Sequence, residues 1–340
     1  MTPTAHHAIV ATLRALPDRA DNPGWMRRAF AHATQAGLAD ISCATPSEAQ
    51  AMMRRMATAG RADLPFGRLF EGHVNALILV AAQGGTAPAD AILGVWNSDI
   101  PGEPLRIDAG LLHGGKNFAS GAGFVTHPIV TLDANDPHAN RMLLVDMARA
   151  TVGIDRAWWN PVGMLRSETH IVRFDGTAVD DRWYLGAPGA YQRQPGFSAG
   201  ALRFVAVQAG GVHALFDHVR DHLLATGRAG HPHQKHRLAR LFGLADAGYA
   251  LIDRTAAAWD TTDPTRIVPL VAAARGGIEA IATEALAIAQ AAIGVQGMQH
   301  THPLAAVLTD LAVYLRQPNP DGARDAAGDA AGAGTIVPGA

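Results

Sequence analysis

Cysteine is almost absent from this chain of 340 residues, since Cys43 is its single example. One cysteine excludes an internal disulfide framework and a cysteine-based zinc site, and it fits a reducing compartment. Runs of lysine and arginine are also missing, and the formal net charge is -2. The sequence therefore lacks the electrostatic signature of a nucleic-acid-binding protein, and we expect no nucleic-acid partner.

Long apolar runs are missing as well. Residues 1–12 contain no apolar core of signal-peptide length. The apolar stretch at 74–82 is too short to span a bilayer. These absences predict a cytoplasmic protein without a membrane partner. What the chain does have is a hydrophobic fraction of 48%, which is enough for two or three domains with sizeable cores.

Helical spacing of apolar residues characterises the first 88 residues. For one of these helices Ser47 is the predicted N-cap and Gly60 the predicted stop. The helices carry no chemical motif, so we interpret them as a packing layer. A linker rich in glycine follows at 84–88. The predicted helices span residues 9–16, 25–35, 47–58 and 68–82.

The pattern changes between residues 89 and 195. Short runs rich in β-branched and aromatic residues alternate with Gly, Pro, Asp and Asn, which is typical of a small antiparallel β-domain. The last run ends at the turn Asp175-Gly176 and alternates, which predicts one buried and one solvated face. The predicted strands span 92–96, 111–120, 129–133, 141–146 and 169–174.

From residue 196 onward apolar residues recur every three or four positions. Asp263 is the predicted N-cap of the third long helix, and Pro269 should kink its first turns or delay its start. A shorter fourth helix follows Pro303. Four helices with short connections predict an antiparallel four-helix bundle over 196–320. The Ala/Gly-rich residues 321–340 are predicted to be disordered.

Two of the predicted strands end in a serine two residues after an aromatic side chain. These pairs are Trp96 with Ser98 and Phe118 with Ser120. An aromatic ring can stack on a flat heteroaromatic ligand while hydroxyls and turn amides bind its edge. The alternative is that Trp96 and Phe118 belong to the core of the β-domain.

The order of the segments resembles the acyl-CoA dehydrogenase family over about residues 65 to 320. The residues at 115–121, Gly-Lys-Asn-Phe-Ala-Ser-Gly, resemble the family segment Gly-x-Lys-x-aromatic-x-Ser/Thr. A second likeness covers 163–169 and 172–176. The resemblance implies an α+β fold with an abbreviated N-terminal helical layer (1–88), a small antiparallel β-barrel or sandwich (89–195) and a C-terminal antiparallel four-helix bundle.

The resemblance implies FAD as the cofactor. Phe118 would pack on the flavin ring and the Ser120 hydroxyl would reach its N5 edge. The preceding strand end would touch the pyrimidine side of the ring with Trp96, Asn97 and Ser98.

A second group of cofactor-binding residues is implied in the bundle. Gly294 and Gly297 resemble the turn that receives FAD from a neighbouring subunit, and Arg228 and Gln234 lie near the family's cofactor-contacting Arg and Gln. The Arg-to-Gln spacing is shorter here than in the family. A shared site implies a homodimer or a homotetramer.

The expected proton acceptor is missing. Pro318 occupies the position of the family's catalytic Glu, and the alternative position at 198–202 has no carboxylate. Removal of an α-proton needs a positioned base, so the catalytic residues are not identified. Arg316 is a weak candidate, expected near the open face of the flavin together with Gln317, His300 and His302, unless it only lies exposed at a helix end.

The resemblance implies an FAD-dependent oxidoreductase that acts on the CH-CH group of an acyl thioester such as an acyl-CoA. One alternative is a monooxygenase of the same fold that uses reduced flavin and needs no such Glu. Another is a degenerate member that keeps the fold as a binding or scaffold protein. The substrate and the electron acceptor are not identified by the sequence.

Three further patterns suggest other chemistry. Ser198 lies in a Gly-x-Ser-x-Gly segment that could be a hydrolase elbow, but we interpret it as a helix N-cap. Histidines could bind a metal ion, although exposure at a helix start is the simpler interpretation, so we predict no metal site. Asp180-Asp181 is interpreted as a solvated turn. The histidines concerned are His231, His233, His236, His300 and His302.

Overall fold

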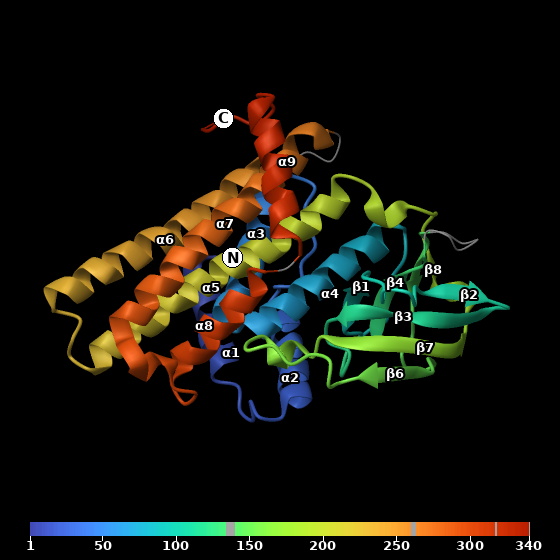
Figure 1. Ribbon diagram of the computed structural model, residues 1–340, viewed down its shortest axis with the longest axis horizontal. Helices are drawn as coiled ribbons and strands as arrows, with labels where there is room; N and C mark the ends of the chain where they lie inside the picture. Colours follow the sequence, from blue (N-terminus) through green and yellow to red (C-terminus); the bar gives the residue numbers. More distant parts are fainter. Residues whose placement is uncertain (134–139, 260–262, 317, 340) are drawn as a thin grey trace.

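The computed structural model describes residues 1–133, 140–259, 263–316 and 318–339. Figure 1 shows a helical bundle on the left, a β-domain on the right, and α4 (Leu64–Ala82) lying between them. A buried cluster joins α4 to the β-domain through residues such as Val80, Leu93 and Ile129. Because α4 also packs on the bundle, it fixes the orientation of the two larger parts.

The N-terminal helices are α1 (Pro3–Arg14), α2 (Asn22–Gln35), α3 (Pro46–Ala62) and α4. The four predicted helices are therefore confirmed, but two signals within α3 are wrong. Thr45 is the N-cap in place of Ser47, since it forms a capping box with Glu48. Gly60 does not stop the helix, because it lies buried against α5, where an added Cβ would approach the Val207 carbonyl oxygen to 2.2 Å.

The β-domain contains two four-stranded sheets, ordered β1-β4-β5-β8 and β2-β3-β7-β6. All pairings are antiparallel except β1 with β4, which is parallel. Five strands coincide with predicted runs, whereas β2, β6 and β8 were missed because each contains at most two apolar residues. The strands are β1 (Leu93–Trp96), β2 (Arg106–Asp108), β3 (Leu111–Ala119), β4 (His127–Thr131), β5 (Met142–Leu144), β6 (Val152–Asp155), β7 (His170–Ala178) and β8 (Tyr184–Leu185).

The bundle consists of α5 (Gly196–Ala225), α6 (Pro232–Ala257), α7 (Pro264–Ile293) and α8 (Pro303–Tyr314). Asp263 is the N-cap of α7 as predicted, and its carboxylate accepts a hydrogen bond of 2.9 Å from the Thr265 amide. Pro269 lies inside α7 and does not delay its start. A short helical turn, η4 (Gly294–Met298), follows α7. By length and composition α5 and the segment Pro264–Met298 could each cross a membrane, but the apolar window of α5 is 72% buried within the protein, as expected of a core bundle helix.

The C-terminal segment differs from the prediction of a disordered tail. Residues Pro320–Gly332 form α9, which packs on α7. Asn319 caps the helix, Ala323 is buried, and the Arg324 guanidinium pairs with Glu279 of α7. Low complexity was misleading here because alanine has the highest helix propensity and a single cap and ion pair suffice to dock the helix.

Candidate functional site

Three aromatic side chains form a partly exposed surface at the edge of the β-domain. The Phe118 ring lies 4.9 Å from the Trp158 ring and 6.4 Å from the Trp159 ring, centroid to centroid. Phe118 is 44% exposed and Trp158 is 38% exposed. Large aromatic groups exposed side by side are unusual on a protein surface and indicate a binding surface. We call these three residues the aromatic shelf.

A chain of buried hydroxyl groups lies beside the aromatic shelf. Thr169 Oγ1 donates a hydrogen bond of 3.1 Å to Ser120 Oγ. Ser167 Oγ lies 2.7 Å from Thr169 Oγ1 and donates a bond of 2.7 Å to the Met164 carbonyl. Each hydroxyl has one proton. Ser120 is the end of this chain, and its hydroxyl can donate to or accept from the edge of a ligand.

The backbone around this chain is strained. Phe118, Met164 and Glu168 have φ angles of 49°, 61° and 45°, in the left-handed region that side chains other than glycine rarely adopt. Such strain costs free energy and collects at functional sites. At Phe118 the strain has a visible effect, because the ring points outward between the buried residues Ala119 and Lys116.

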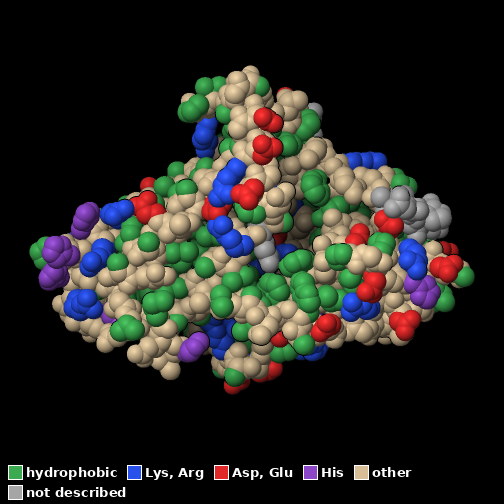
Figure 2. All heavy atoms as spheres, in the orientation of Figure 1, with side chains coloured by type: hydrophobic (Ala, Val, Ile, Leu, Met, Phe, Trp, Pro, Cys, Tyr) green, Lys and Arg blue, Asp and Glu red, His purple; other side chains and the backbone are tan. Residues whose placement is uncertain are grey.

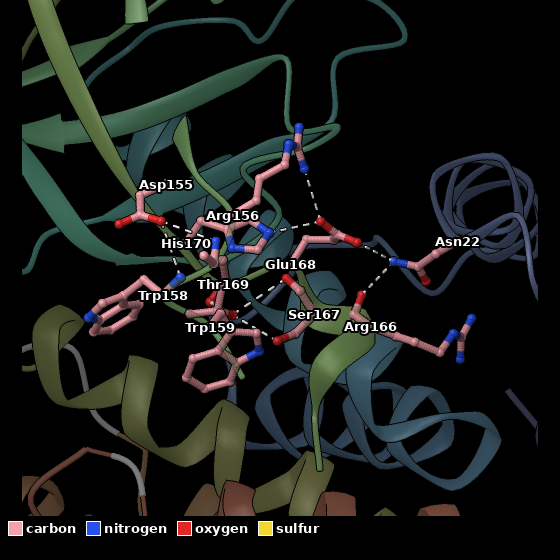
Figure 3. A network of polar contacts seen from close by, with 12 residues as sticks. Asn22, Asp155, Arg156, Trp158, Trp159, Arg166, Ser167, Glu168, Thr169 and His170 are labelled. Atoms are coloured by element: carbon pink, nitrogen blue, oxygen red, sulfur yellow. Dashed lines mark hydrogen bonds and ion pairs between the residues drawn. The ribbon is translucent and has the colours of Figure 1, made fainter. Parts of the chain in front are cut away.

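Figure 3 shows how the loop that carries the tryptophans is held. The Asp155 carboxylate accepts hydrogen bonds of 3.1 and 3.2 Å from the amides of Ala157 and Trp158. Trp159 Nε1 donates to the Met164 carbonyl at 3.0 Å. Sequence reasoning missed Trp158 and Trp159, although two consecutive tryptophans after a short strand were a usable signal.

The strand end next to this loop is held from the other side by Glu168. Its carboxylate lies 2.9 Å from His170 Nε2, 3.1 Å from Arg156 Nη1 and 3.2 Å from Asn22 Nδ2 (Figure 3). Asn22 belongs to α2, so the N-terminal layer fixes the position of the hydroxyl chain. His170 is buried, and its Nδ1 has no hydrogen-bond partner within the described part of the chain.

The bundle fixes the same loop through α8. The Asp310 carboxylate accepts a hydrogen bond from the Met164 amide. A Cβ at Gly163 would lie 2.2 Å from the Thr309 carbonyl oxygen, so only glycine permits this approach. Burial raises the pKa of Asp310 to about 6. The loop is therefore positioned jointly by the β-domain, α2 and α8.

The predicted residues 96–98 lie beside the hydroxyl chain. Trp96 is 1% exposed, and its Nε1 donates 2.9 Å to the Ser120 carbonyl, so it belongs to the core as the alternative interpretation predicts. The Asn97 carbonyl accepts from Lys116 Nζ at 3.3 Å. The Ser98 carbonyl accepts from the Asn117 amide at 2.9 Å, which ties the end of β1 to β3.

The predicted bundle residues form a second, separate group. Gln234 is buried, its Nε2 donates 3.0 Å to the Ala292 carbonyl, and its Oε1 has no partner among the described residues. Gly294 has a φ angle of 76°, and Gly297 is buried. Arg228 is exposed in the α5–α6 connection. Figure 1 places this connection and η4 at the end of the bundle away from the β-domain, where Figure 2 shows histidine side chains gathered.

The polar residues expected at the open face of the flavin have other contacts. Arg316 pairs with Glu279, which also pairs with Arg324. His302 Nε2 lies 3.1 Å from His222 Nδ1, and the His302 ring caps α8. Gln317 lies outside the described residues. Nothing in these contacts assigns a catalytic role to Arg316.

The alternative chemical patterns find little support. Ser198 lies in the first turn of α5 after a loop and not after a strand, so the hydrolase elbow is wrong. The N-cap of α5 is Pro195, so the prediction of Ser198 as the N-cap is wrong as well. Within the described residues, no group of three or more His, Cys, Asp or Glu side chains could hold a metal ion. Asp180 pairs with Arg149 and Arg182.

A small cavity of about 10 Å³ lies between α4 and β1, lined by Arg68, Gly72 and Ser120 among others. This volume suits one water molecule and not a cofactor. A flat ligand at Ser120 would therefore have to approach from the aromatic shelf.

No family model matches the sequence, and no curated protein matches it. Solved structures do match the fold. XiaF from Streptomyces sp., solved with FADH2 and glycerol, has a TM-score of 0.75 at 17% identity and covers 98% of this chain and 96% of its own. The 3-HSA hydroxylase from Rhodococcus sp. RHA1 has a TM-score of 0.72 at 14% identity, covering 98% and 97%.

Butyryl-CoA dehydrogenase from Megasphaera elsdenii has a TM-score of 0.68 at 14% identity and covers 82% of this chain and 81% of its own. The chain therefore has the acyl-CoA dehydrogenase fold.

Proposed function

We propose that this protein is a flavin-dependent oxidoreductase whose flavin lies against the aromatic shelf. The observation that carries the proposal is the exposed Phe118–Trp158 pair beside the buried hydroxyl chain that ends at Ser120. An exposed ring offers a face for stacking, and the Ser120 hydroxyl offers a hydrogen-bonding group for the edge of the same ligand. A bound flavin would supply the redox chemistry.

FAD is the proposed form of the flavin. Gln234 in α6 and Gly297 in η4 belong to the bundle, and the α5–α6 connection and η4 lie at its end away from the β-domain that carries Phe118 (Figure 1). A second copy of the chain could bring them to the distal half of FAD, which FMN lacks. The unpartnered Gln234 Oε1 supports a polar ligand there.

A monooxygenase that uses reduced flavin and oxygen is the reaction class that we favour. Pro318 stands where a proton-abstracting Glu would be needed, and Glu279, on the neighbouring α7, is neutralised by Arg316 and Arg324. Hydroxylation of a small molecule does not require that Glu. XiaF, solved with FADH2, and the 3-HSA hydroxylase have a fold similar to that of this chain, which is compatible with this proposal.

Dehydrogenation of an acyl thioester is the second candidate, because butyryl-CoA dehydrogenase has the same fold. This reaction requires a base, and the contacts described for the aromatic shelf do not supply one. A binding or scaffold role is the third. A cytoplasmic location and a small-molecule substrate stay predictions for all three.

The visible absorption spectrum of the purified protein with FAD or FMN tests the proposal. A flavin-dependent enzyme binds one of them and shifts its spectrum. Anaerobic bleaching by butyryl-CoA would favour the dehydrogenase over the monooxygenase. Oxygen uptake only with enzymatically reduced flavin would favour the monooxygenase. A protein that binds neither flavin would exclude both enzymes.

A further inference from the structure

Arg203 is a buried cation that forms no ion pair with any described residue. It lies in α5 and is 3% exposed. Its Nη2 donates a hydrogen bond to the neutral Asn75 side chain, and its Nε is buried without a partner. Across the described part of the chain it forms no ion pair. Arginine remains protonated in proteins, so this guanidinium is a positive charge in the interior.

Among the described residues, the carboxylate that acts on Arg203 is that of Glu71, which is already paired. Glu71 Oε1 lies 2.6 Å from Arg68 Nη1, and both belong to α4. Burial lowers the pKa of Arg203, and the Glu71 carboxylate opposes this without reaching ion-pair distance. The cluster therefore contains two guanidinium groups for one carboxylate, an arrangement that a bound anion would balance.

Other largely buried arginines in the protein, in contrast, form ion pairs with carboxylates. Arg61 donates hydrogen bonds of 2.7 and 2.9 Å to the two oxygens of Asp217. Arg55 lies 3.3 Å from an oxygen of Asp40. An unpaired buried charge is costly and is usually avoided. The lack of a carboxylate partner for Arg203 among the described residues thus indicates a site built for a ligand.

The surroundings of Arg203 suit the body of an aromatic ligand. Tyr191 and Phe197 form an edge-to-face pair with ring centroids 5.5 Å apart, and Phe197 is 46% exposed. Gly200, one helical turn from Phe197, lies next to the guanidinium, since an added Cβ would lie 3.8 Å from Arg203 Nη2. Tyr314 of α8 is 2% exposed, and its hydroxyl has no partner among the described residues.

We infer that Arg203 binds the carboxylate of a small aromatic acid at the contact between α4 and α5. Under the proposed function, on which this identification of the ligand rests, that acid is the substrate. Arg68 links the Arg203 cluster to the candidate flavin site, because it pairs with Glu71 in the cluster and lines the cavity next to Ser120. A carboxylate at Arg203 would therefore hold the aromatic ring of the substrate on the side of α4 that faces the candidate flavin site.

The first test compares the same substitution at an unpaired and at a paired arginine. Arg203→Met in the full-length, ligand-free protein should leave the melting temperature unchanged or raise it, because an uncompensated charge is replaced by an apolar side chain. Arg61→Met should lower it by several degrees, because Asp217 loses its main partner. A loss of stability for Arg203→Met as large as that for Arg61→Met would contradict the inference.

The second test measures binding of benzoate by calorimetry at constant ionic strength, with benzyl alcohol as the neutral control. The wild-type protein should bind benzoate saturably and benzyl alcohol at least tenfold more weakly. Arg203→Met should abolish the preference. If that variant fails to fold, Arg203→Lys should bind benzoate about tenfold more weakly, since an ammonium group cannot form the bidentate pair.

Flavin binding is measured separately, so the two proposals fail separately. Benzoate binding that depends on Arg203 in a protein that binds no flavin would keep the anion site and remove the oxidoreductase. Flavin binding without any preference for benzoate over benzyl alcohol would overturn the anion site and leave the oxidoreductase intact.

Discussion

At the scale of single residues, Phe118 shows why local sequence rules fail at a binding surface. A β-strand pattern places successive side chains on opposite faces. The register between β3 and β7 shifts between Lys116 and Ala119, and Phe118 adopts a left-handed backbone conformation there. The strain turns a ring that would be buried into an exposed one, which we interpret as a functional feature.

Phe118→Ala tests the aromatic shelf. We expect flavin affinity to fall about tenfold, which corresponds to the loss of one aromatic contact. Stability should change little, because the ring is 44% exposed. Titration of flavin fluorescence measures the affinity. The matched control is Phe242→Ala, since Phe242 is 60% exposed on α6, away from the β-domain.

Equal losses of flavin affinity in both variants would contradict the placement of the flavin at Phe118. A loss confined to Phe118→Ala, together with an unchanged melting temperature, would support it.

Asp310 gives a prediction about pH. Burial raises its pKa from 3.8 to about 6, so the folded state binds more protons than the unfolded state between these values. Its contribution is therefore fully present below about pH 4 and is lost as the pH rises to about 6. Asp310→Asn should be more stable than wild type at pH 7 by up to about 3 kcal/mol.

Urea unfolding of both proteins at pH 4 and pH 7 measures this difference. The Asn oxygen can still accept the hydrogen bond from the Met164 amide, so the loop should keep its position. The prediction is wrong if the two proteins differ by the same amount at both pH values.

At the scale of elements, the contact between α3 and α5 depends on small residues. Added Cβ atoms at Gly60 and Gly210 would lie 2.2 and 2.0 Å from backbone oxygens of the facing helix. The two helices can approach this closely only because glycine has no side chain. A glycine that signals a helix stop in the sequence is therefore a packing residue in the fold.

Gly60→Ala should destabilise the protein by about 2–3 kcal/mol, because the clash is with backbone and cannot be relieved by a rotamer change. Gly243→Ala is the matched control, since Gly243 lies in α6 with nothing within 4 Å of its added Cβ. That change should stabilise the protein by about 0.5–1 kcal/mol. Thermal unfolding distinguishes the two, and a shift in the same direction for both would refute the packing argument.

At the scale of the whole molecule, the predicted cofactor residues fall into two separate groups, one where the β-domain meets the helices and one at the far end of the bundle (Figure 1). We propose that both groups act on one FAD in an assembly of at least two copies of the chain. We expect a dimer or larger assembly by light scattering. Gln234→Leu should weaken binding of FAD about tenfold and leave binding of FMN unchanged, because the bundle end would contact only the part that FMN lacks.

Assemblies that contain two different variant subunits test this prediction further. Phe118→Ala and Gln234→Leu subunits should each bind FAD poorly alone, whereas a co-expressed mixture should recover a fraction of the tight sites. A monomer, or a mixture that binds no better than its components, would contradict a site shared between subunits.

The sequence by itself determined the helices α1 to α8, most strands and their order, because apolar periodicity and caps are local properties. It also indicated Phe118 and Ser120, since an aromatic residue and a hydroxyl at this spacing are visible in one short segment. It could not place Trp158, Thr169 or Arg203, whose roles arise from contacts between β6, β7, α4 and α5. Whether a buried arginine has a partner depends on which helices meet, and only the tertiary structure decided that.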